Sequence, residues 1–241
     1  MIRYLNGNQN NIEKKLELIL NERKKVQQNK FKVVKPMIEN VKKNGDKAVI
    51  KYEKKFSNVK IKRIALKFSE KEINSIIKKV DQRLKQSIDT AFTRIKNFHK
   101  KQKIYPFKFK DKYKNELSYE YSPIDRVGVY VPGGTASYPS TVLMNCIPAM
   151  VAGVKNIFLT TPALGQNINP AILYAAKKCG VKEIYKTGGA HSIAALTYGT
   201  KTFKKVDKIV GPGNAFVAAA KKEVYGDVGI DMIAGPSEVT I

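Results

Sequence analysis

The feature that most constrains this chain is an alternation of short β-branched runs and helix-length segments, which starts at Arg126. Parallel strands joined by helices give such a pattern, and their right-handed crossovers put the carboxyl ends of all strands on one edge of the sheet. We therefore expect an α/β fold, with a parallel sheet and helices on both faces. The expected strands are 127–131, 156–160, 183–186 and 206–210, with extended chain from 230, and the expected helices are 140–151, 170–179, 193–198 and 214–225.

Residues 1–125 are expected to form a mainly helical N-terminal region, because apolar residues recur there at helical spacing. The expected features are, in order, a helix from Ile12, a helical segment over 36–56 interrupted at Asn44-Gly45 and restarted by Asp46 as N-cap, a capping box of Ser69 with Glu72, a long helix over 81–103, and a strand or hairpin over 108–121.

The chain is strongly basic, with a formal net charge of +25, of which +19 falls within residues 1–125. Of its 45 basic residues 39 are Lys and only 6 are Arg, although Arg is preferred for bidentate contacts to phosphate and guanine. The excess charge is therefore read mainly as a drift in composition, and no specific nucleic-acid partner is expected. A polyanion-binding face on the Lys-rich half is the alternative.

Cysteine and histidine are too sparse to build a zinc site from motif spacing. The two cysteines, Cys146 and Cys179, lie in apolar segments and are expected to be buried free thiols in a reducing cytoplasm. The two histidines, His99 and His191, belong to no zinc-binding motif. The first thirty residues are polar and charged, and the longest apolar run, 141–154, is too short to span a bilayer. We expect a soluble cytoplasmic protein with no membrane association.

Three glycine-rich turns, at 132–134, 188–190 and 211–214, follow expected strands and should lie on one edge of the sheet. Ligands of open α/β sheets bind at that edge, where glycine allows close backbone approach and helix N-termini offer N–H groups to phosphate. Neither G-x-G-x-x-G nor a P-loop is present. A nucleotide-like ligand and ordinary turn chemistry both remain open.

Single polar residues near these turns have two interpretations each. His191 can cap or pack, or it can hydrogen-bond a ligand at the sheet edge. Ser237 and Glu238 can be a turn hydroxyl and a solvated carboxylate, because no Ser-His-Asp spacing makes Ser237 a nucleophile. His99 ends the long helix and is expected to interact favourably with the helix C-terminus.

Together these segments resemble histidinol dehydrogenase, the enzyme that oxidises L-histidinol to L-histidine through histidinaldehyde in two NAD-dependent steps, the last of histidine biosynthesis. The resemblance covers essentially the whole chain and is strongest over 126–239. The segments that carry it are 98–102 (FHKKQ), 126–134 (RVGVYVPGG), 140–144 (STVLM), 188–190 with 193–196 (GGA and IAAL), 206–209 (VDKI), 211–217 (GPGNAFV), 230–232 (IDM) and 234–239 (AGPSEV).

By position, the resemblance implies that Tyr130, His191 and Asn214 contact NAD and that Ser237 contacts the substrate. The sequence departs from the family at His191, where glutamine is usual, and at Ile233, where proline is usual. The family's zinc ligands and its Glu–His acid–base pair are expected beyond Ile241. We therefore expect no catalytic and no metal-binding residues within the 241 residues, and neither histidinol dehydrogenase activity nor stoichiometric zinc from the chain alone.

The resemblance also implies a homodimer with an aldehyde-dehydrogenase-like, two-lobed architecture. In it, 126–236 is a Rossmann-like NAD-side domain, 1–125 is part of the first domain, and 237–241 begins the return of the chain to that domain. An enzyme fragment is the leading hypothesis. The alternatives are a non-catalytic NAD-binding or interaction module and a Lys-rich polyanion-binding protein.

Overall fold

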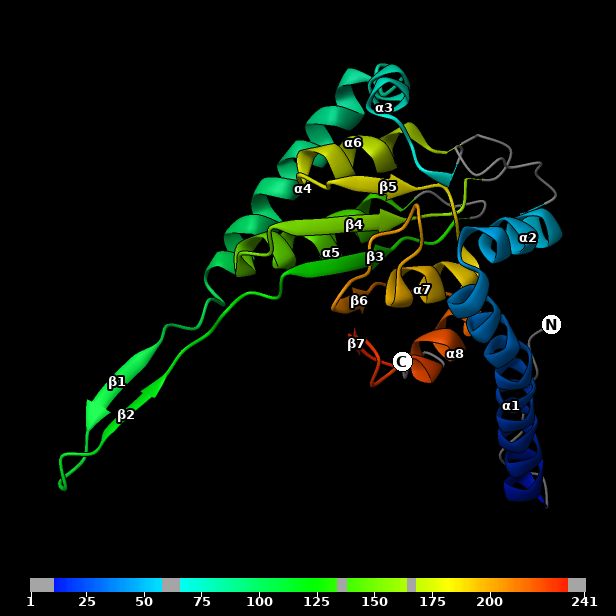
Figure 1. The fold of residues 1–241 in the computed structure, drawn as a ribbon, viewed down its shortest axis with the longest axis horizontal. Helices are drawn as coiled ribbons and strands as arrows, with labels where there is room; N and C mark the ends of the chain where they lie inside the picture. The colour runs from blue at the N-terminus through cyan, green and yellow to red at the C-terminus, as the bar shows by residue number, and fades with distance from the viewer. Residues whose placement is uncertain (1–10, 58–65, 134–137, 164–167, 234–241) are drawn as a thin grey trace.

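A five-stranded parallel sheet forms the centre of the computed structural model, which describes residues 11–57, 66–133, 138–163 and 168–233 (Figure 1). The strand order is β5-β4-β3-β6-β7, with every neighbouring pair parallel. The chain moves outward from β3 to β5 and then returns to place β6 on the other side of β3. This reversal is the switch point of a Rossmann-like sheet, so the predicted α/β fold is confirmed. The strands are β3 (Arg126–Tyr130), β4 (Asn156–Thr160), β5 (Glu183–Tyr185), β6 (Lys208–Val210) and β7 (Gly229–Ile230).

Helices cover both faces of the sheet, and each face has its own apolar cluster (Figure 1). One face carries α3 (Glu70–Ile77), α4 (Gln82–Lys100), α5 (Pro139–Ala152) and α6 (Pro170–Lys178), and the other carries α1 (Ile12–Asn44), α2 (Asp46–Ser57), α7 (Gly189–Tyr198) and α8 (Ala215–Glu223). The helical N-terminal residues thus pack on the same sheet as the helices that follow the strands.

Strand β3 lies at the centre of the sheet, and alternate side chains enter the two clusters. Val127 and Val129 belong to the cluster under α5 and α6, whereas Tyr130 belongs to the cluster under α7 and α8. Opposite orientation of successive residues is the rule in a strand. It directs Tyr130, at the carboxyl end of β3, toward the first residues of α7.

Local sequence signals in the N-terminal region are largely confirmed. Ser69 and Glu72 form the predicted capping box, with Glu72 N–H donating to Ser69 Oγ at 3.2 Å and Ser69 N–H donating to Glu72 Oε2 at 2.8 Å. Gly45, with φ of +53°, ends α1, as its left-handed backbone requires. The two expected helical segments before it form one helix, with Pro36 inside. Helix α2 begins at Asp46 itself.

Several element boundaries differ from the sequence prediction by a few residues. Helix α7 begins at Gly189, four residues earlier than expected, because glycine residues 188 and 189 form the N-cap and first turn. Strand β6 begins at Lys208, two residues later than expected. The predicted hairpin is present as β1 (Phe107–Lys110) and β2 (Glu116–Tyr119), which pair antiparallel.

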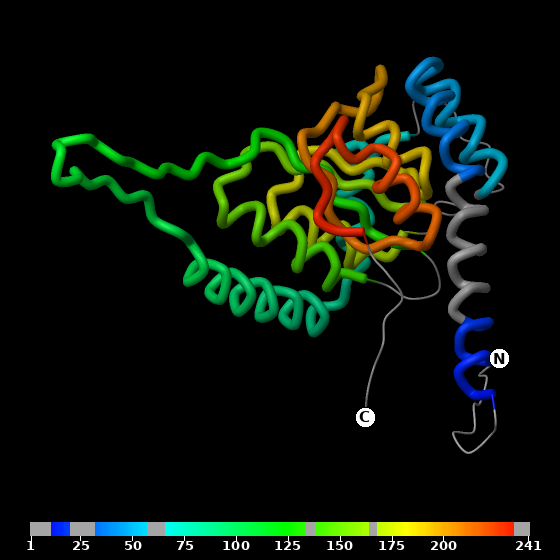
Figure 2. The backbone as a smooth tube through the Cα atoms, turned by 90° about the horizontal axis from the view of Figure 1, so that it is seen from below, coloured from blue at the N-terminus to red at the C-terminus, as the bar shows by residue number. Residues whose placement is uncertain are grey.

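The β1–β2 hairpin projects away from the rest of the molecule (Figure 2). Phe107 pairs with Tyr119 and Phe109 pairs with Leu117, so all four side chains lie on one face of the hairpin. All four side chains are exposed to solvent. In the described parts of the chain, no helix is both long and apolar enough to cross a membrane.

The two cysteines, distant in sequence, are brought together between α5 and α6. Both thiols are free and buried, as predicted. Hydrogen bonding to the Cys179 thiol, followed by burial, raises the pKa of Cys146 well above its ordinary value. Because the thiolate is the reactive form, a raised pKa makes Cys146 a poor nucleophile.

We expect alkylation by iodoacetamide to be on the order of 100-fold slower in the folded chain than in denaturant, because burial and a scarce thiolate both oppose it. Mass spectrometry of the intact chain, sampled over time with and without denaturant, measures both rates. A model thiol peptide serves as the control for reagent activity. Rapid uptake of one equivalent by the folded chain would contradict the buried position of the pair.

Candidate functional site

A pocket of about 440 Å³ opens at the carboxyl edge of the sheet, close to the switch point between β3 and β6. Its walls come from the turns after β3, β4, β5 and β6 and from helices α1 and α2 on one side. Ligands of open α/β sheets occupy this position. The lining residues are Val33, Met37, Glu53, Phe56, Tyr130, Pro132, Gly133, Pro162, Gly188, Gly189, Ala190, His191, Asn214 and Phe216.

Tyr130 lies in the wall formed by β3 and is only 3% exposed. Its hydroxyl oxygen accepts a hydrogen bond from the Gly189 N–H at 3.1 Å. Burial raises the pKa of Tyr130; the Gly189 hydrogen bond opposes this rise, and the nearby Glu53 carboxylate adds to it as the smallest of the three effects. The phenol therefore stays neutral at physiological pH and connects β3 to the turn before α7.

Asn214 follows β6 and caps α8. Its Oδ1 accepts hydrogen bonds from the N–H groups of Phe216 at 3.0 Å and Val217 at 3.1 Å. These two bonds fix the orientation of the amide, because only the oxygen can accept. The amide nitrogen is therefore the part of this exposed side chain that can donate to a ligand.

His191 lies on the interior side of the pocket and is 3% exposed. Its Nε2 is 2.9 Å from Glu53 Oε1. The aromatic rings of Tyr52 and Phe56, both from α2, lie 5.8 and 6.2 Å from the imidazole centroid. Its Nδ1 is buried and has no hydrogen-bond partner among the described residues. His191 thus packs against aromatic side chains and also lines the pocket. The packing role and a role at the ligand site do not exclude each other.

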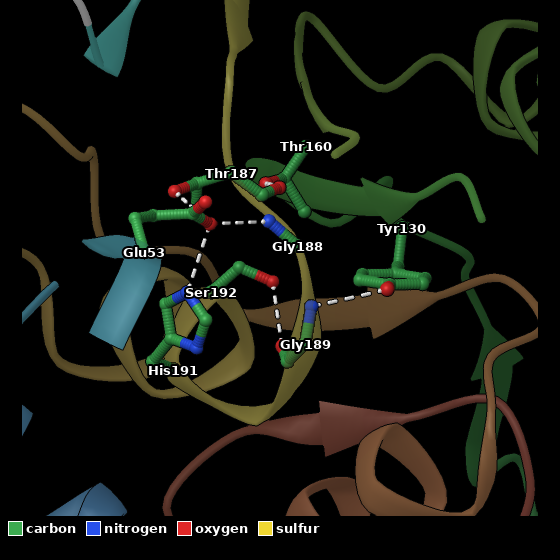
Figure 3. Close-up of polar contacts among 8 residues, drawn as sticks. All are labelled: Glu53, Tyr130, Thr160, Thr187, Gly188, Gly189, His191 and Ser192. Carbon is green, nitrogen blue, oxygen red and sulfur yellow. Dashed lines mark hydrogen bonds and ion pairs between the residues drawn. The ribbon is translucent and has the colours of Figure 1, made fainter. Parts of the chain in front are cut away.

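Glu53 is a site residue that the sequence did not reveal. Its carboxylate oxygen Oε1 accepts hydrogen bonds from Thr187 Oγ1 at 2.7 Å and Gly188 N–H at 3.0 Å, besides contacting His191 (Figure 3). The side chain is 3% exposed. In the sequence, Glu53 stands beside Lys54 and Lys55 in a charged helix. Nothing local distinguishes it from a solvated carboxylate.

The glycine-rich turns owe their composition largely to close packing. A Cβ at Gly188 would lie 2.2 Å from Cγ of Pro162, and a Cβ at Gly133 would lie 2.9 Å from Cβ of the same proline. Gly211 has φ of +113°, and a Cβ there would lie 2.2 Å from the carbonyl oxygen of Tyr130. Glycine therefore lets the turns approach one another and form one continuous pocket wall.

Several N–H groups at the starts of helices α7 and α8 donate hydrogen bonds to side chains of the chain itself. The Gly188 and Gly189 N–H groups, at the start of α7, donate to Glu53 and to Tyr130. The first turn of α8 is capped by Asn214. These N–H groups therefore already have acceptors within the chain. The apolar and aromatic walls of the pocket are the stronger indication of a ligand.

The remaining candidate residues lie elsewhere. His99 is near the end of α4, where its Nδ1 is 2.6 Å from Gln102 Oε1, away from the pocket. Ser237, the expected substrate contact, lies outside the described residues, as does Glu238. Among the residues that the structure describes, no group of three or more His, Cys, Asp or Glu side chains could hold a metal ion. Those residues do not fit a zinc site.

Comparisons with known proteins point to one family. A sequence profile described as histidinol dehydrogenase matches residues 20–241. Histidinol dehydrogenase of Pelagibacter ubique is 56% identical over 243 residues, which are 100% of this chain and 56% of that protein. The enzyme of Mesorhizobium japonicum is 45% identical, over 95% of this chain and 53% of its own length.

The fold is also similar to that of a solved structure. The crystal structure of histidinol dehydrogenase from Elizabethkingia anophelis superposes with a TM-score of 0.82 at 44% sequence identity, over 86% of this chain and 48% of that one. This chain spans about half the length of the curated relatives that it matches. The extent of the profile match and the fold, taken with the pocket at the switch point, show that this chain belongs to the histidinol dehydrogenase family.

Proposed function

We propose that the protein is an NAD-dependent oxidoreductase of L-histidinol, and that the described chain supplies its NAD-binding side. The observation that carries this proposal is the pocket at the sheet switch point, where Tyr130, His191 and Asn214 line one cavity. In the proposal 126–236 is the dinucleotide-binding domain, and the protein works as the homodimer that the family resemblance implies. The exposed apolar face of the β1–β2 hairpin supports such an assembly.

The pocket suits the flat, partly apolar rings of a dinucleotide. Phe56 and Phe216 supply aromatic walls, and Met37 and Pro132 supply aliphatic ones. The Asn214 amide nitrogen can orient a ligand, because its oxygen is engaged in capping α8. A mostly apolar cavity with a few convergent polar groups is typical of cofactor sites. When bound, NAD supplies the hydride acceptor for the oxidation.

The residues of this chain bind and orient, in the proposal, and the apolar walls exclude water. Alcohol oxidation also needs a base for the hydroxyl proton. The titratable side chains that line the described pocket are Glu53, Tyr130 and His191. Glu53 contacts His191, and Glu53 and Tyr130 accept hydrogen bonds from the turn before α7. We therefore propose that the 241-residue chain binds NAD but does not by itself oxidise histidinol. No step through zinc is assigned to it.

The proposal is tested by titrating NAD+ into the purified chain in a calorimeter and by following NADH absorbance after histidinol is added. We expect saturable binding and no NADH. Tyr130→Phe is expected to weaken binding by about five- to tenfold, because the part-buried Gly189 N–H loses its acceptor.

Tyr174→Phe is the matched control, since Tyr174 donates to Asp89 on the opposite face of the sheet and should leave NAD+ affinity unchanged. Absence of NAD+ binding by the unmodified chain would refute the proposed cofactor role. NADH formation from histidinol by the chain alone would refute the proposal that the chain does not by itself oxidise histidinol.

A further inference from the structure

Glu53 reaches the pocket from a helix that lies far from the glycine-rich turn in sequence. The residues that bind its Oε1 are 134 to 138 positions later in the chain. A buried carboxylate is costly unless it is hydrogen-bonded. Here a hydroxyl, a backbone N–H and an imidazole converge on a single oxygen, with all three distances between 2.7 and 3.0 Å.

Two side chains of helix α2 form hydrogen bonds with residues at the two ends of α7. Near its N-terminus, the Asp46 carboxylate accepts hydrogen bonds from the hydroxyls of Thr200 and Thr202, in the loop that follows α7. Two turns later, Glu53 binds the residues that begin α7. The position of α7 along the sheet is therefore defined by two carboxylates of one neighbouring helix.

The turn between β5 and α7 is held at successive residues (Figure 3). Thr160 Oγ1 donates to the Thr187 carbonyl, Gly188 N–H donates to Glu53, and Gly189 N–H donates to Tyr130. Gly189 has φ of +66°, in the left-handed region where glycine is permissive. Without these side chains, a turn of two glycines would have many accessible conformations.

The same carboxylate determines how the His191 ring carries its proton. Glu53 Oε1 already accepts hydrogen bonds from Thr187 and Gly188, so the ring nitrogen beside it is assigned as a donor. The neutral ring then has its hydrogen on Nε2. Nδ1, which has no partner among the described residues, is left as an acceptor.

We propose that Glu53 is a positioning residue of the pocket: it fixes the Gly188–Gly189 turn and holds His191 as the Nε2–H tautomer. In that tautomer the buried Nδ1 is an acceptor on the side of the ring that faces Gly189. The identity of the ligand rests on the proposed function, whereas the geometry of Glu53 does not.

The test compares Glu53→Ala and Glu53→Gln with the unmodified protein, in the form in which the organism makes it. We expect Glu53→Ala to weaken NAD+ binding by about tenfold or more, because three donors lose their acceptor and the turn loosens. Glu53→Gln keeps an oxygen at this position and should bind NAD+ within about threefold of the unmodified protein. Asp89→Ala is the control, because Asp89 accepts from Tyr174 on the opposite face.

Two measurements on the ligand-free protein separate positioning from general stability. The ring ¹⁵N shifts of His191 report the tautomer, and hydrogen exchange reports the protection of the Gly188 amide. Glu53→Ala should change the tautomer and speed Gly188 exchange, whereas Asp89→Ala should lower only the thermal midpoint. If Glu53→Ala does not fold, Glu53→Asp withdraws the carboxylate by one methylene and should produce the same changes in part.

Unchanged ¹⁵N shifts and unchanged Gly188 exchange in folded Glu53→Ala or Glu53→Asp would overturn the positioning role. If the unmodified protein fails to bind NAD+ while these two signals still respond as expected, the proposed function fails and the role of Glu53 stands.

Discussion

Replacing Gly211 with alanine is expected to lower the free energy of unfolding by about 3 kcal/mol or more. Gly211 has φ of +113°, a conformation that L side chains rarely adopt. The new Cβ would also lie 2.2 Å from the carbonyl oxygen of Tyr130 and 3.2 Å from its backbone nitrogen. Both are backbone atoms of β3, so relief would require a central strand to move. Urea denaturation followed by circular dichroism measures the change.

Gly226→Ala is the matched control for this prediction. Gly226 has φ of +106°, close to that of Gly211, but a Cβ there would meet nothing within 4 Å. We expect Gly226→Ala to lower the free energy of unfolding by about 1–2 kcal/mol, because only the unfavourable backbone conformation contributes. The difference between the two variants therefore isolates the contact with β3. Equal costs would show that the close approach of the turn to Tyr130 contributes nothing.

Lys221→Met is expected to lower the free energy of unfolding by about 2–3 kcal/mol. The Lys221 ammonium is buried, donates to the Gly211 carbonyl at 2.9 Å and pairs with the Asp231 carboxylate. Methionine fills much of the same volume but leaves both acceptors without their cation. Loss of a fully buried partner costs more, about 3–5 kcal/mol, and the value here is lower because the Asp231 side chain is 29% exposed.

Thermal and urea unfolding of Lys221→Met, beside Lys182→Met, measure the effect. Lys182 is exposed, so its substitution should change stability by no more than about 0.5 kcal/mol. Lys221→Met combined with Asp231→Asn should recover part of the loss, because the uncompensated charge is removed as well. A Lys221→Met variant as stable as the Lys182 variant would contradict a structural role for the pair.

Much of the fold could be predicted from local sequence. The strand over 156–160 and the capping box of Ser69 and Glu72 lie where the sequence placed them, because their signals depend on neighbouring residues. One helix boundary differs from the sequence prediction at a pair of glycine residues. Helix α7 begins inside a glycine pair that would ordinarily end a helix, since distant side chains satisfy its first N–H groups.

Some residues of the candidate site could likewise be predicted from local sequence, and others could not. Tyr130 and Asn214 could be named because they sit at strand ends with recognisable flanking sequences. Glu53 could not, because the residues that hydrogen-bond its Oε1 within the described chain lie at least 134 positions away. Its own surroundings in sequence are basic and polar. The interior orientation of His191 also depends on that distant helix, through Tyr52 and Phe56.

The attachment of α2 to the turn before α7 has a consequence for the order of folding. The adjacent strands β3, β4 and β5 are joined by short crossovers and can form from nearby parts of the chain. The pocket cannot, because its walls include Met37 and Glu53 at one end of the chain and Phe216 at the other. Contacts of such sequence separation carry a large loop-closure entropy and form late. Cofactor binding during refolding would therefore follow the docking of the first two helices rather than the formation of the sheet.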